Sequence, residues 1–129
     1  RTAEDMEEIY AYRSMRFALV DEGSLTARMN PSLAASLVSN LLKNAYVHGD
    51  RGGTVSVTVA PHELRVCNSG GGGALDAEHI FERFYQGTKK EGSTGLGLSI
   101  VDAVCRLYGL RVGYSYINRC HCFSVHFRI

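Results

Sequence analysis

A glycine-rich turn that leads directly into a helix could bind an anion, and residues 92–98 have this form. Gly95 and Gly97 precede an apolar pattern that predicts a helix from about Leu98 to Tyr108. Such a turn directs backbone N–H groups and a partial positive charge at whatever lies in front of it. It has neither the Gly-Lys-Ser/Thr of a Walker loop nor the preceding strand of a dinucleotide fingerprint. By itself, the pattern is more typical of an ordinary helix start after a flexible loop.

Two asparagines in a helix predicted over residues 31–47 could hold a divalent cation. Asn40 and Asn44 are four residues apart, so their side chains lie one above the other on one side of that helix. Neutral amide oxygens suit Mg²⁺ when phosphate oxygens and waters complete its octahedral shell. The alternative is that both amides only hydrogen-bond to nearby backbone groups.

A third asparagine, Asn68, ends a predicted strand and is followed by Ser69 and the glycines at 70–73. An acceptor held at a strand end can receive the amino group of adenine, and glycines let a flat ring approach the backbone closely. A turn-forming asparagine is an equally common explanation for such a position.

Local patterning predicts the elements that position these three features. Asn30 and Pro31 predict the start of the long helix, and Gly49 predicts its end. Strict alternation predicts a hairpin of residues 54–59 and 64–68. Weaker patterns predict a strand pair over residues 15–21 and 25–29, and a short helix over residues 76–85. They also predict a flexible surface loop over residues 87–94 and two closing strands over residues 110–116 and 120–129.

The composition limits the function classes. A chain of 129 residues is expected to form a single domain, and its formal net charge of +1 shows no basic nucleic-acid footprint. No apolar run approaches the roughly 20 residues of a membrane span, and we expect no signal segment in these residues. Because the chain starts at Arg1 without Met, we expect residues 1–14 to be a connecting helix or linker to a preceding region, and residues 15–129 to be the domain.

The four cysteines fit neither a zinc site nor a disulfide scaffold in their spacing. We therefore expect reduced, mostly buried thiols. Cys120, His121 and Cys122 invite a metal assignment, but in an extended strand the histidine points away from the two cysteines, which disfavours it.

Four motifs occur in an order that resembles the ATP-binding domain of sensor histidine kinases. Its N box resembles residues 40–48 (NLLKNAYVH), and its first glycine box resembles residues 68–70 (NSG). Its F box resembles residues 81–85 (FERFY), and its second glycine box resembles residues 95–98 (GLGL). The resemblance implies an α/β two-layer sandwich of the Bergerat type, in which helices cover one face of a mixed, mostly antiparallel sheet.

The resemblance also implies roles for individual residues in binding ATP and Mg²⁺. Asn44 would hold Mg²⁺, Asn40 would support the phosphates, and Asn68 would receive the adenine amino group. Gly70 would shape the base pocket, and residues 86–94 would form a lid. Further ATP contacts would come from both glycine boxes, the N-box lysine and the aromatic anchors of the lid, namely Lys43, Gly72, Phe81, Phe84, Thr94, Gly95, Leu96, Gly97 and Leu98. Simple core packing is the alternative for Phe81 and Phe84.

The chain departs from the family pattern at three positions. Asn68 stands where an Asp is usual, and Val47 and Gln86 stand where basic residues are common. Lys43, or the cations of residues 83–90, would have to compensate. These departures leave open a nucleotide-binding pseudokinase, and the shared architecture leaves open a serine kinase of the anti-sigma type.

Histidine kinases transfer the γ-phosphoryl group of ATP to a histidine, so the resemblance implies this reaction in two-component signalling. None of the five histidines stands in the Glu-Pro context of the family's phosphorylation site. We therefore expect the acceptor in a dimerisation domain of the parent protein outside this chain, with a response regulator downstream. We expect no nucleic-acid partner and no direct membrane contact. The location would be cytoplasmic, whether or not the parent protein is anchored in the inner membrane.

Overall fold

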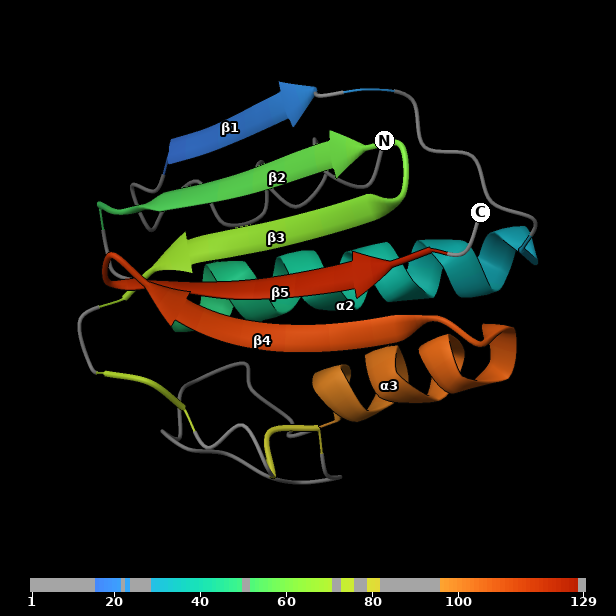
Figure 1. Cartoon of the computed structure of the whole chain (residues 1–129). Helices are drawn as coiled ribbons and strands as arrows, with labels where there is room; N and C mark the ends of the chain where they lie inside the picture. Colours follow the sequence, from blue (N-terminus) through green and yellow to red (C-terminus); the bar gives the residue numbers. More distant parts are fainter. Residues whose placement is uncertain are drawn as a thin grey trace.

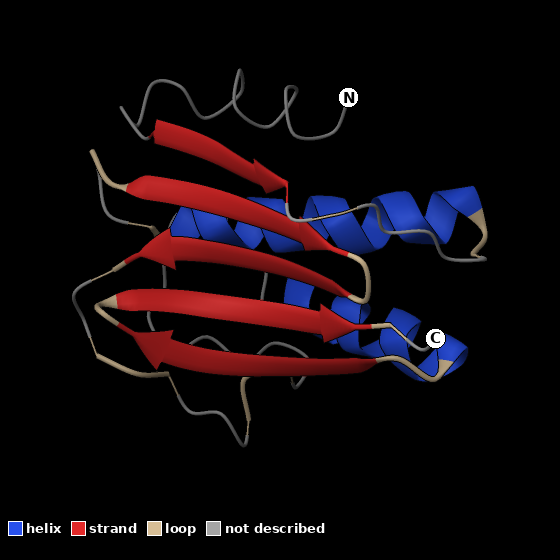
Figure 2. Ribbon diagram, turned by 45° about the horizontal axis from the view of Figure 1, so that its top comes forward, coloured by secondary structure: helices blue, strands red, loops and turns tan. Residues whose placement is uncertain are grey.

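The computed structural model describes residues 16–21, 23, 29–49, 52–70, 73–75, 79–81 and 96–127. These residues form one mixed five-stranded sheet, with two helices against one of its faces (Figures 1 and 2). This confirms the predicted α/β two-layer arrangement. The elements in chain order are β1 (Arg16–Asp21), α2 (Pro31–His48), β2 (Thr54–Ala60), β3 (Glu63–Ser69), α3 (Gly97–Tyr108), β4 (Arg111–Ile117) and β5 (Cys120–His126).

The strand order is β1-β2-β3-β5-β4, and only the pairing of β1 with β2 is parallel. A parallel pair needs a long crossover connection, and α2 lies in the segment that joins these two strands. The predicted strand over residues 15–21 is therefore confirmed, and β2 is its partner in the sheet. The other half of the predicted strand pair lies outside the described residues except for Met29, which is not in a strand.

Both helices begin or end where local chemistry predicts. Oδ1 of Asn30 accepts the backbone N–H groups of Ser32 and Leu33 at 2.8 and 3.3 Å, and Pro31 follows as the first helical residue of α2. Gly109 ends α3 in the left-handed region, with a φ of 67°. No helix in the described part of the chain is both long enough and apolar enough to cross a membrane.

The core lies between the helices and the inner face of the sheet. Alternate residues of β2, β3 and β5 point into it because side chains in a strand alternate between faces. Val55, Val66, Phe123 and Val125 are among the most deeply buried of these residues. The same alternation brings two polar residues, Asn68 and His121, to the inner face.

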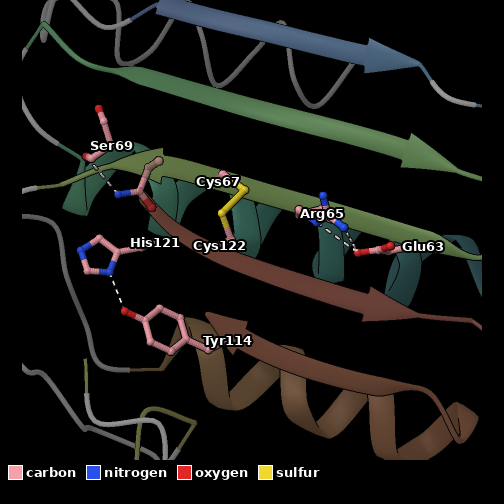
Figure 3. Close-up of a disulfide and its surroundings, with 8 residues drawn as sticks. Glu63, Arg65, Cys67, Ser69, Tyr114, His121 and Cys122 are labelled. Atoms are coloured by element: carbon pink, nitrogen blue, oxygen red, sulfur yellow. Dashed lines mark hydrogen bonds and ion pairs between the residues drawn. A yellow bond between two sulfur atoms is a disulfide. The ribbon is translucent and has the colours of Figure 1, made fainter. Parts of the chain in front are cut away.

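The expectation of four reduced thiols is wrong for one pair of cysteines. Cys67 of β3 and Cys122 of β5 face each other in the register and form a disulfide across the two strands (Figure 3). Sequence spacing does not show this pairing, because the two residues are 55 positions apart. Cys105 and Cys120 are free thiols. Burial and the Asp102 carboxylate raise the pKa of Cys105 from 9.0 to about 11, so this thiol stays protonated and unreactive at neutral pH.

Replacing both Cys67 and Cys122 with serine should lower the free energy of unfolding by about 2–4 kcal/mol under non-reducing conditions, because the unfolded chain loses a cross-link that closes a long loop. Urea denaturation with and without dithiothreitol measures the effect. Reductant should destabilise the native chain and a Cys120→Ser control, and it should leave the double variant unchanged. Equal midpoints for the native chain and the double variant without reductant would contradict the assignment.

Candidate functional site

The first turn of α3 lies directly against Asn40 of α2. A Cβ atom added to Gly97, the first residue of α3, would lie 3.3 Å from Oδ1 of Asn40. Nδ2 of Asn40 donates to the carbonyl oxygen of Ser36 at 2.7 Å and to its Oγ at 3.2 Å. These bonds orient the amide and leave its oxygen on the side of Gly97. The N box and the second glycine box are thus in contact.

Asn44 and Lys43 lie one turn further along α2. Asn44 is about 6 Å from Asn40 along the helix axis and on the same side of the helix. Its side chain is half-buried, and among the described residues its amide makes no hydrogen bond. Lys43 is also half-buried and forms no ion pair within the described part of the chain. An amide oxygen and an ammonium group therefore remain for a ligand.

The N-terminus of α3 lacks the capping that α2 has. The residue before the helix, Leu96, makes no side-chain cap, and the first turn contains no acidic residue. The backbone N–H groups at the start of a helix have no partners within the helix, and its dipole is positive there. The start of α3 is therefore suited to an anion, and the oxygen of Asn40 lies beside it.

A second group of predicted site residues, Asn68 and Gly70, adjoins His121. Asn68 is 1% exposed and pairs with His121 across β3 and β5. Its Nδ2 donates to the carbonyl oxygen of Ser69 at 3.3 Å. A Cβ on Gly70 would lie only 2.8 Å from Cδ2 of His121 and 3.7 Å from Nδ2 of Asn68. Gly70 therefore cannot be replaced by a larger residue without displacing His121.

A chain of hydrogen bonds holds His121, and the sequence analysis missed this role. Nδ1 of His121 lies 2.7 Å from the Tyr114 hydroxyl (Figure 3). The same hydroxyl accepts the N–H of Leu75 at 2.9 Å. Burial raises the pKa of Tyr114, so the phenol stays protonated at neutral pH and can donate to Nδ1. The Tyr116 hydroxyl donates to the carbonyl oxygen of Gly70 at 2.8 Å. Strand alternation predicted that His121 lies on the other face of the strand from its two flanking cysteines. It did not predict the contact with Tyr114.

The remaining predicted site residues fall into two groups. Phe81 packs edge-on against Phe123 with ring centroids 6.1 Å apart, and Leu98 also packs against the core. This supports the core-packing alternative for Phe81. Four further residues lie outside the described part of the chain, so their roles stay predictions: Gly72, Phe84, Thr94 and Gly95.

Comparison with protein families gives a match over most of the chain. Residues 29–128 match the family described as histidine kinase-, DNA gyrase B- and HSP90-like ATPases. Sensor histidine kinase RppB of Synechocystis sp. is 40% identical over 94 residues, which cover 66% of this chain and 21% of that protein. Sensor protein QseC of Salmonella typhi is 41% identical over 87 residues, which cover 65% of this chain and 19% of QseC. The chain thus spans about a fifth of the length of these curated relatives.

Solved structures share the fold. The mycobacterial sensor histidine kinase MprB superposes with a TM-score of 0.79 at 22% identity, over 96% of this chain and 91% of that one. Full-length ShkA in complex with AMPPNP superposes with a TM-score of 0.78 at 24% identity, over 96% of this chain and 27% of ShkA.

Replacing Tyr114 with phenylalanine should lower the free energy of unfolding by about 1–3 kcal/mol, because both Leu75 N–H and His121 Nδ1 lose a partner in a partly buried place. The matched Tyr116→Phe variant removes one hydrogen bond, to Gly70, and should cost about 1 kcal/mol. Urea denaturation of the two variants measures the difference. A Tyr114→Phe variant no less stable than Tyr116→Phe would contradict the hydrogen-bonded chain.

Proposed function

Because the chain belongs to the family of histidine kinase-, DNA gyrase B- and HSP90-like ATPases, we propose that it binds ATP with Mg²⁺ and transfers the γ-phosphoryl group to a histidine. That histidine lies in a dimerisation domain outside residues 1–129. Two-component signalling kinases are its relatives, which supports this reaction over other uses of ATP. A response regulator would receive the phosphoryl group in turn.

The observation that carries the proposal is the contact between Asn40 and the start of α3, where the first turn holds no acidic residue. Phosphate oxygens placed there would face backbone N–H groups and a positive helix end. Asn44 extends the same side of α2 with an amide oxygen, which suits Mg²⁺ bridged to phosphate. Lys43 supplies a cation from the neighbouring position. The phosphate end of the site thus has groups of the right chemistry on two rigid helices.

The base end of the site is consistent with a purine. Asn68 carries an acceptor and a donor at the end of β3, and Gly70 leaves room only for its own backbone beside His121. Full-length ShkA, part of which shares this fold, was solved in complex with AMPPNP, which supports a nucleotide here. We place the adenine edge at Asn68, as the resemblance to the family implies.

The proposed reaction needs positioning more than covalent help from the protein. The bond between the γ-phosphorus and its bridging oxygen breaks while a bond to an imidazole nitrogen forms. ADP leaves with the bridging oxygen, and the imidazole loses its proton to solvent. Mg²⁺ bound with the nucleotide would neutralise charge on the phosphate oxygens. Asn40, Lys43 and the start of α3 would hold those oxygens in line with the acceptor.

One observation favours a second candidate, a pseudokinase that binds nucleotide without transfer. Val47 stands where the family commonly has a basic residue, and it is buried in the core with 3% exposure. No cation can act on phosphate from that position. The serine kinase alternative has no comparable support in the described residues. The proposed location is cytoplasmic, which agrees with the structural similarity to the cytoplasmic segment of histidine kinase QseC.

Titration calorimetry with a non-hydrolysable ATP analogue should show binding that Mg²⁺ strengthens. Asn44→Ala removes one metal ligand, and we expect it to weaken Mg²⁺-dependent binding by about tenfold or more. Ser32→Ala is the matched control, because Ser32 is exposed in the first turn of the same helix, roughly 18 Å from Asn44 along the axis. This control should bind like the native chain.

Transfer is tested by offering labelled ATP together with the histidine-bearing dimerisation domain of the parent protein. Acid-labile phosphate on that domain supports the histidine kinase, and tight binding without transfer supports the pseudokinase. Acid-stable phosphate on a protein substrate would point to a serine kinase. No nucleotide binding with or without Mg²⁺ would contradict the proposed function.

A further inference from the structure

The amide of Asn68 is buried yet keeps hydrogen-bonding capacity that the protein does not use. Asn68 is 1% exposed, and among the described residues its side chain makes one hydrogen bond, from Nδ2 to the carbonyl oxygen of Ser69. An amide nitrogen has two hydrogens and an amide oxygen has two lone pairs. Within the described residues, one N–H donor and the acceptor oxygen of Asn68 therefore have no protein partner.

No carboxylate stands next to this amide among its described neighbours in the sheet register and along the chain. Val55 and His121 flank Asn68 in the sheet register, and Ser69 and Gly70 follow it along the chain. A carboxylate can only accept hydrogen bonds at neutral pH, whereas an amide both donates and accepts. Burial increases the cost of a mismatched pair, because an unpaired polar group in the interior loses its hydration.

Adenine and 6-oxopurines present opposite donor and acceptor patterns at the edge that such an amide can meet. Adenine presents a 6-amino donor next to the N1 acceptor, and a 6-oxopurine presents an oxygen acceptor next to an N1–H donor. An asparagine amide can pair with both groups of either edge after a half-turn about its terminal torsion. The half-turn breaks the 3.3 Å hydrogen bond to Ser69 and turns Oδ1 toward that carbonyl oxygen, a cost that disfavours one of the two pairing modes without abolishing it. A carboxylate would instead repel the oxygen of a 6-oxopurine.

From this we propose that Asn68 makes the site ambivalent at the purine 6-position, so that it binds 6-oxopurine nucleotides as well as adenine nucleotides. This inference rests on the proposed nucleotide-binding function. It assigns the substrate class as purine nucleotides with either a 6-amino or a 6-oxo group.

Calorimetric titration of the chain with ADP and with IDP, each with Mg²⁺, tests the inference directly. The two ligands differ only at the 6-position and N1, so a 2-amino group cannot confuse the result. We expect the two dissociation constants of the native chain to lie within about tenfold of each other. Asn68→Asp should raise the preference for ADP by about tenfold or more, because the carboxylate rejects the 6-oxo group.

The Asn68→Asp variant is its own folding control, since it should still bind ADP. Ser124→Ala, on the outer face of β5, should leave the ratio of the two affinities unchanged. Native binding of ADP about a hundredfold tighter than IDP would overturn the inference and leave the proposed function intact. An unchanged ratio in Asn68→Asp would also overturn it. Failure of the native chain to bind either ligand would overturn both proposals.

Discussion

The close approach of α3 to α2 is the constraint on which the candidate site depends. Gly97 begins α3 beside the amide oxygen of Asn40, at a distance where a side chain would already be tight. The amide nitrogen of Asn40 is occupied by Ser36, so the oxygen faces the start of α3. Two helices that are far apart in sequence thereby bring the start of α3 beside Asn40, with Asn44 one turn further along the same side of α2. The proposed anion binding depends on this contact.

The register of β3 against β5 constrains the other end of the site. It pairs Asn68 with His121 on the inner face and Cys67 with Cys122 on the outer face. A shift of one residue would exchange the faces, burying the cysteines and exposing the polar pair. The disulfide therefore fixes the pairing beside the residues that would meet the base. Tyr114 adds a second restraint, since it ties His121 to the segment around Leu75.

Local chemistry made much of this architecture predictable from the sequence. Asn30, Pro31 and Gly109 mark helix ends through capping, and strict alternation marks the β2 and β3 hairpin. The features that escaped prediction all depend on long-range pairing. The parallel partner of β1, the disulfide and the Tyr114 to His121 contact join segments whose relative placement no local pattern contains. The roles of Asn40, Asn44 and Asn68 came from family resemblance, and the structure adds their surroundings.

A crystal structure of the chain with ADP and Mn²⁺ in place of Mg²⁺ tests the central claim most directly, because anomalous scattering locates the metal independently of the nucleotide. The account predicts the metal at the amide oxygen of Asn44, with phosphate oxygens at the first turn of α3 beside Asn40. Phosphates bound away from α3, or a metal held without Asn44, would contradict it.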